Sequence, residues 1–108
     1  MPSKEKVKGN SFEIKVRNMF REKDIECVRA WGSDGRSLGM NEEVDVLATH
    51  KGIKYTIQCK VRKKIAQFFK PSEDIYAQVM QEDRDIPYAV VRLSDLIDLI
   101  KDKSNVEE

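Results

Sequence analysis

Two strand-like runs that follow each other closely constrain the fold of this chain most. Residues 43–50 and 53–60 are rich in β-branched and aromatic side chains, which suit the pleated, half-buried surface of a sheet. A Lys-Gly pair separates them, and so short a connection predicts an antiparallel β-hairpin. The second run ends in an amide and an ammonium, Gln58 and Lys60, which share one face because alternate strand residues point the same way. Two polar groups at the end of a core-like strand are a candidate functional site.

Helical and strand-like periodicities on either side of the hairpin complete an expected α/β domain. The expected elements are a helix over residues 10–23, strands over 26–31, 43–50 and 53–60, a loop over 32–41, a helix from Ser72, a strand over 88–93 and a last helix from Ser94. This αβββαβα order predicts a layered domain in which helices flank a mixed β-sheet. We expect one domain over residues 1–108, with residues 1–7 and 102–108 flexible.

Two of these elements depend on specific patterns. The helix from Ser72 is predicted because a serine can cap it and because apolar residues recur at helical spacing, at positions 75, 76, 79 and 80. The strand over 88–93 is apolar nearly throughout, which is typical of a strand that is buried on both faces. We therefore expect this strand to lie inside the molecule.

The composition argues against several classes of protein. No apolar run approaches the ~20 residues that a membrane-spanning helix needs, and the first ten residues do not resemble a signal peptide, so we expect an intracellular, cytoplasmic protein. Cys27 and Cys59 lie in strand-like runs and are expected to be reduced and buried. A single histidine and the lack of a Cys-x-x-Cys pair argue against a zinc site.

The charges are unevenly distributed although the net charge is only +1. Residues 51–72 contain seven basic residues and no acidic one, whereas residues 73–85 contain five acidic residues and one arginine. A solvated surface is the plainer explanation of such blocks. A basic face for a polyanion is the sharper explanation, because the basic block includes the polar strand end.

A carboxylate in the first run of the hairpin can reach the polar end of the second. Asp45 lies among aliphatic neighbours, where an ionised carboxylate is costly unless it is paired or metal-bound. In a hairpin of this length its side chain can reach the face that Gln58 and Lys60 share. Oxygen ligands hold Mg²⁺, which polarises a phosphate and acidifies water, and a nearby ammonium positions that water or offsets developing charge. These three residues therefore suit phosphodiester hydrolysis.

The spacing of these residues resembles that of the PD-(D/E)XK nuclease superfamily. A dozen residues lie between Asp45 and the Gln-Cys-Lys run at 58–60. Residues 8–13, KGNSFE, resemble the start of the archaeal-type Holliday junction resolvases, in which a glycine precedes a helix that carries a catalytic glutamate. Residues 28–35, VRAWGSDG, resemble their strand followed by a mobile, serine-bearing loop.

The resemblance implies a restriction-endonuclease-like fold and a structure-selective DNA endonuclease that resolves four-way junctions. It also implies a homodimer that hydrolyses paired phosphodiester bonds with Mg²⁺, for which Mn²⁺ is expected to substitute. The implied metal ligands are Glu13, Asp45, Gln58 and the backbone carbonyl of Cys59. Lys60 would act on the attacking water, and Ser33 would be the catalytic serine of the loop. The basic residues expected to bind DNA are Lys8, Arg36, Arg62, Lys63 and Lys64.

Two positions depart from the pattern of that superfamily. Val44 replaces the proline that usually precedes the aspartate, but that proline contributes no ligand. Gln58 stands where most relatives have glutamate, so the site keeps an oxygen ligand but loses one negative charge. The Gln-x-Lys form also resembles the Mrr-type restriction endonucleases. A restriction- or repair-type endonuclease on duplex DNA, or a DNA-binding module that has lost cleavage, therefore stays open as an alternative.

Three residues also have a structural explanation that competes with the functional one. Asn10 and Glu13 nearly match a capping box, in which the glutamate bonds the cap's backbone N–H, although the other motif residues favour a metal ligand. Ser33 lies in ordinary turn chemistry, and Ser37 could be the equivalent serine. Trp31 is expected to pack in the core or in a dimer rather than to stack on bases.

Overall fold

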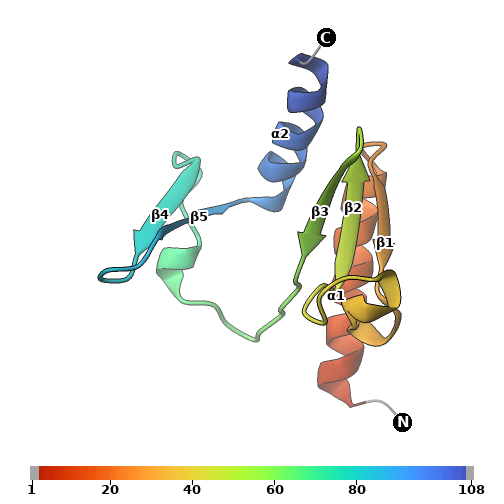
Figure 1. The fold of residues 1–108 in the computed structure, drawn as a ribbon. Coiled ribbons are helices and arrows are strands. Elements are labelled where there is room, and N and C mark those ends of the chain that lie inside the picture. The colour runs from red at the N-terminus through yellow and green to blue at the C-terminus, as the bar shows by residue number, and fades with distance from the viewer. Residues whose placement is uncertain (1–2, 107–108) are drawn as a thin grey trace.

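The computed structural model describes residues 3–106, apart from the side chains of Ser33 and residues 103–106. Its helices and strands are α1 (Lys4–Arg21), β1 (Glu26–Arg29), β2 (Val46–His50), β3 (Ile53–Ile57), β4 (Ala77–Gln81), β5 (Pro87–Val91) and α2 (Leu93–Val106) (Figure 1). Short 3₁₀ turns lie at Trp31–Ser33, Gly35–Leu38 and Gln67–Phe69. Neither described helix combines the length and the apolar character that crossing a membrane requires. The expected α/β class, which is compatible with a restriction-endonuclease-like fold, is confirmed.

The predicted hairpin is present as β2 and β3. The two strands pair in antiparallel fashion, with Val46 opposite Ile57. Lys51 and Gly52 connect them with φ angles of 53° and 80°, and positive φ at both central residues is what a type I′ hairpin turn requires. β1 pairs antiparallel with the other edge of β2, which gives a three-stranded sheet in the order β1-β2-β3.

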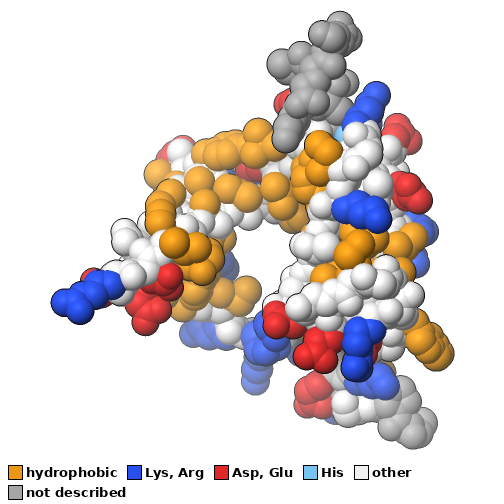
Figure 2. All heavy atoms as spheres, viewed as in Figure 1, with side chains coloured by type: hydrophobic (Ala, Val, Ile, Leu, Met, Phe, Trp, Pro, Cys, Tyr) orange, Lys and Arg blue, Asp and Glu red, His pale blue; other side chains and the backbone are white. Residues whose placement is uncertain are grey.

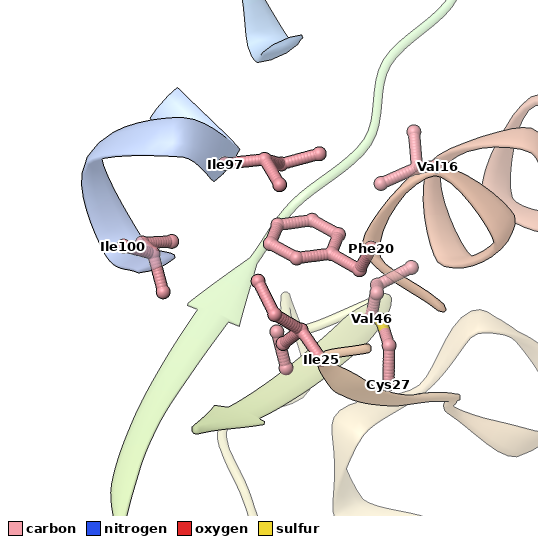
Figure 3. Close-up of a cluster of buried hydrophobic side chains, with 8 residues drawn as sticks. Val16, Phe20, Ile25, Cys27, Val46, Ile97 and Ile100 are labelled. Atoms are coloured by element: carbon pink, nitrogen blue, oxygen red, sulfur yellow. The ribbon is translucent and has the colours of Figure 1, made fainter. Parts of the chain in front are cut away.

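The core lies between this sheet and α1. Val16 and Phe20, one helical turn apart on α1, belong to a single buried cluster with Cys27 of β1 and Val46 of β2 (Figure 3). Ile97 of α2 joins the same cluster, so the last helix packs back on the same core. This packing fixes α1 against the sheet, and with it the side chains that α1 directs towards the ends of the strands.

The helix expected from Ser72 is wrong, because this part of the chain contains β4. A single turn follows Ser72, closed by a 3.0 Å hydrogen bond from the Ile75 N–H to the Ser72 carbonyl. β4 then pairs antiparallel with β5, with Val79 opposite Ala89. The apolar spacing of this segment suits a helix as well as a strand, and pairing with the β-branched residues of β5 favours the strand. The order is therefore αβββββα, and the strand pairs in the described residues are antiparallel rather than mixed.

β4 and β5 form a two-stranded sheet of their own, apart from the first sheet (Figure 1). We call residues 65–91 the arm and the rest of the described chain the body. The expectation that the strand over 88–93 is buried on both faces is wrong, since most of β5 is exposed. The Cα radius of gyration is 15.3 Å, whereas a compact chain of this length has about 13 Å. A compact body thus carries an extended arm.

Candidate active site

Asp45 lies directly before β2 and is held by the backbone on both sides. Its N–H donates to the Ile57 carbonyl, and its own carbonyl accepts from the Ala30 N–H, each at 2.9 Å. The side chain is buried, and its Oδ2 accepts a 2.7 Å hydrogen bond from the Cys59 N–H. A short bond from an amide to a carboxylate is among the stronger hydrogen bonds in proteins. The predicted approach of Asp45 to the end of the neighbouring strand is confirmed.

Glu13 reaches the same region from α1. Its side chain is buried, and its Oε1 accepts hydrogen bonds from the Arg29 guanidinium, at 3.2 Å from Nη2 and 3.4 Å from Nε. Asn10 bonds the same guanidinium at 3.4 Å. The helix begins at Lys4, with the Ser3 side chain accepting from the backbone of its first turn. The capping-box explanation of Asn10 and Glu13 is therefore wrong.

The polar strand end follows β3 directly. Gln58 and Lys60 are exposed, and Cys59 between them is half-buried. Burial raises the pKa of the Cys59 thiol to about 12, and the nearby carboxylates of Asp45 and Glu13 contribute to this rise. Two consequences follow. Both carboxylates act on one thiol, so they belong to one electrostatic neighbourhood, and Cys59 remains a neutral thiol at physiological pH rather than a nucleophilic thiolate.

A cleft of about 530 Å³ brings these side chains together. Its walls include the sequence-predicted residues Glu13, Asp45, Gln58, Cys59 and Lys60. Four further residues border it, namely Gly32, Asp34, Glu42 and Glu43. The sequence motif does not include Asp34 or Glu42, although Glu42 and Glu43, which lie shortly before Asp45, are a signal for further acidic site residues. The cleft thus holds more negative charge than the sequence motif alone indicates, and we call it the acidic cleft.

The donors on this cleft fit a hard divalent cation. The described residues contain no group of three or more His, Cys, Asp and Glu side chains arranged to hold a metal ion. Glu13 and Asp45 nevertheless offer two buried carboxylates, and Gln58 adds an amide oxygen where a third acid would otherwise stand. Magnesium is usually held by one or two carboxylates together with water and substrate phosphates. The oxygen donors are therefore of the kind that such an ion binds.

A second cleft, of about 570 Å³, adjoins the first and is basic. Cys59 and Lys60 border both clefts. The other residues lining the second cleft are Glu5, Lys8, Gly9, Val61, Arg62 and Lys63. Three of the five predicted DNA-binding residues, Lys8, Arg62 and Lys63, thus lie together beside the acidic cleft. Lys64 is exposed but does not line either of these two clefts.

The loop between β1 and β2 is held by its own side chains. The Ser37 hydroxyl accepts from the Trp31 N–H at 2.9 Å and donates to the Asp34 carbonyl at 3.0 Å. Arg36 bonds the Asp34 carboxylate, which holds the pKa of that carboxyl below its usual value. The backbone of Ser33 lies in a 3₁₀ turn at the cleft rim, but its side chain is outside the described part of the structure. Core packing of Trp31 is wrong, because its side chain is 77% exposed.

Gly35 lies where this loop passes close to the segment that precedes Asp45. A Cβ atom placed there would come within 2.0 Å of the Asn41 carbonyl oxygen and 2.8 Å of the Val44 Cβ. Contacts that short do not occur without movement of the backbone. The loop therefore rests directly on the residue that precedes Asp45.

The Arg29–Glu13 pair predicts a specific loss of stability. In Arg29→Met the Glu13 carboxylate stays buried while it loses its cationic hydrogen-bond donor, so we expect the free energy of unfolding to fall by about 2 kcal/mol. Chemical denaturation measures this difference. Arg17→Met is the matched control, because Arg17 bonds only an exposed neighbour among the contacts that the structure gives, and a change within about 0.5 kcal/mol is expected there. Equal losses in the two variants would contradict this interpretation.

Comparison with known proteins adds one match. The family model of archaeal Holliday junction resolvase (Hjc) matches residues 4–80, which run from the start of α1 into β4 and include both clefts. Searches of curated proteins and of solved structures gave no significant match. The matched segment covers well over half of the 108 residues.

Proposed function

The chain belongs to the archaeal Holliday junction resolvase family, and we propose that it is a Mg²⁺-dependent endonuclease that cuts paired strands of a four-way DNA junction as a homodimer. The observation that supports this most is the acidic cleft, in which two buried carboxylates from different elements meet an amide and a lysine at one strand end. The family match covers each of these residues. Mn²⁺ is expected to replace Mg²⁺, since it accepts the same oxygen ligands.

Five of the residues that line the acidic cleft have a chemical role in this proposal. Glu13, Asp45, the Gln58 side-chain carbonyl and the Cys59 backbone carbonyl would hold the divalent cation. When bound, such a cation polarises the phosphate and makes water a stronger acid. Hydrolysis adds a water oxygen to phosphorus and breaks one P–O ester bond. The Lys60 ammonium orients that water and stabilises the negative charge that grows on the phosphate oxygens. The Cys59 N–H keeps the Asp45 carboxylate in one orientation.

The basic cleft gives the proposed enzyme a path for the DNA backbone. Lys8, Arg62 and Lys63 line it, and Lys60 connects it to the acidic cleft. Such residues contact phosphates, which position a nucleic acid without reading its sequence. Selection would then depend on the shape of the DNA. Lys64 and Arg36 are exposed, and we propose that they also contact DNA phosphates, although Arg36 must first give up part of its pairing with Asp34. Ser33 remains a candidate catalytic serine at the rim.

The test is cleavage of labelled four-way junctions against linear duplexes of the same sequence. We expect paired nicks near the crossover with Mg²⁺ or Mn²⁺, none with EDTA, and junction binding that excess linear duplex does not displace. Equal cutting of linear duplex would replace the resolvase with a restriction- or repair-type nuclease. That outcome has a basis in Gln58, because the Gln-x-Lys form resembles the Mrr-type enzymes. Binding without cleavage under any metal would leave only a DNA-binding module.

A further inference from the structure

The arm exposes apolar side chains that a single chain leaves without cover. Eight large apolar residues of the arm are between 40% and 66% exposed, namely Ile65, Phe68, Phe69, Ile75, Tyr76, Val79, Ile86 and Tyr88. The buried core described for the chain draws no member from β4 or β5. An isolated two-stranded hairpin is marginally stable in water and needs a surface to pack on. The arm therefore has the apolar composition that is typical of a protein interior, although these side chains are exposed.

The size of this apolar surface matches one side of a protein–protein interface. An aromatic side chain buries roughly 150–250 Å², so eight half-exposed large side chains present on the order of 800 Å². Each partner in an interface of standard size contributes about 800 Å². Val79 and Tyr88 lie on opposite faces of the β4–β5 sheet, so a partner that covers this area must contact both faces. Figure 2 shows hydrophobic side chains along the arm, where it borders an opening between the arm and the body.

We propose that the arm is the contact through which two copies of this chain associate, with the arm of each copy packed against the body of the other. This inference deepens the proposed function and rests on it, because paired cuts across one junction need two active sites. The excess radius of gyration and the exposed β5 describe a chain whose arm is not closed onto its own body. When two copies exchange an identical element, the apolar surface of both arms is covered at the same time, and the resulting dimer has closed two-fold symmetry.

The charges of the arm favour a protein partner over DNA. The turn between β4 and β5 carries Glu82, Asp83 and Asp85 beside Arg84. Over the whole arm, five acidic residues outnumber two basic ones. Such a surface repels phosphates. The body offers the complementary charge at β3, which is one of the two outer strands of its sheet and carries Lys54, with Lys51 in the adjoining turn. The free edge of β3 can accept backbone hydrogen bonds from an added strand. One chain thus contains both halves of the contact.

The test measures molar mass by light scattering, without DNA and without metal. Val79 and Tyr88 project from opposite faces of the β4–β5 sheet and are 66% and 60% exposed, so replacing both with Asp removes no intramolecular core contact. We expect the parent to have twice the 12.5 kDa mass of the chain, and the Val79→Asp/Tyr88→Asp variant to have the single mass. Val7→Asp is the matched control, an apolar residue of α1 that is 49% exposed, and it should remain a dimer.

A second measurement on the unmodified chain guards against a variant that misfolds. Hydrogen exchange of β4 and β5 amides should slow as protein concentration rises through the dimerisation range, while that of α1 amides does not change. A monomeric parent, a dimeric double variant or exchange of β4 and β5 that ignores concentration would overturn the proposal. Junction cleavage is scored separately. If the parent dimerises through the arm but cuts no DNA, the proposed function alone is refuted. If the parent cuts junctions and the double variant stays dimeric, the interface alone is refuted.

Discussion

Asp45→Asn is expected to lower the rate of junction cleavage by roughly 10³-fold, the scale seen when a key electrostatic group is removed from an active site. The replacement has the same shape, and its amide oxygen can still accept the hydrogen bond from the Cys59 N–H that Asp45 accepts at 2.7 Å. The fold and the basic cleft should therefore be preserved. What is lost is a negative charge at a buried position of the acidic cleft.

The measurement for Asp45→Asn is the single-turnover rate of junction cleavage, beside junction affinity and the free energy of unfolding. Asp98→Asn on α2 is the matched control, because Asp98 is exposed and borders neither described cleft. It should cut at the parental rate. Parental cleavage by a folded Asp45→Asn variant would show that this carboxylate is structural.

Replacing Gln58 should separate a ligand from a bystander. Gln58→Ala removes an oxygen from the acidic cleft, so half-maximal cleavage should need about 10–100 times more Mg²⁺, comparable to the loss when support of a metal site is removed. Gln58→Glu restores a third acid beside Glu13 and Asp45, so it should need less Mg²⁺ and cut at least as fast as the parent. Cleavage rates measured across a Mg²⁺ titration give the Mg²⁺ requirement and the maximal rate of each variant, and calorimetry measures metal binding directly.

Thr56→Ala is the matched control for Gln58→Ala, because Thr56 is exposed on β3 two residues earlier and does not border the acidic cleft. An unchanged Mg²⁺ requirement in Gln58→Ala would make Gln58 a bystander. Glu43, which borders the same cleft, would then be the residue to replace next.

The sequence predicts the part of the site that depends on local geometry. Alternation along the two runs and a two-residue connection determine the hairpin, and the register that puts Val46 opposite Ile57 brings Asp45 next to the strand end. The sequence after Ser72 could not be assigned in this way, because its apolar spacing fits a helix and a strand equally well. Pairing of β4 with β5 makes the choice, and the connection between them, residues 82–86, is longer than the two-residue connection of the first hairpin.

The remaining features of the site depend on packing between elements. Arg29 meets Glu13 because the core fixes α1 against β1, and neither residue's local pattern indicates the other as its partner. Trp31 is apolar by composition but lies on a turn whose backbone is bonded to Ser37, so its side chain faces solvent. Burial follows from the whole arrangement and not from the hydrophobicity of one residue.

The close approach at Gly35 links the loop to the chemistry in a way that a list of functional groups would miss. A side chain at this position must displace the backbone near Asn41 or the Val44 side chain, and Val44 is covalently joined to Asp45. Movement of the loop would then act on the residue that precedes the carboxylate. A residue without any reactive group can therefore tolerate as little variation as a catalytic one, and inactive variants at position 35 report displaced geometry rather than missing chemistry.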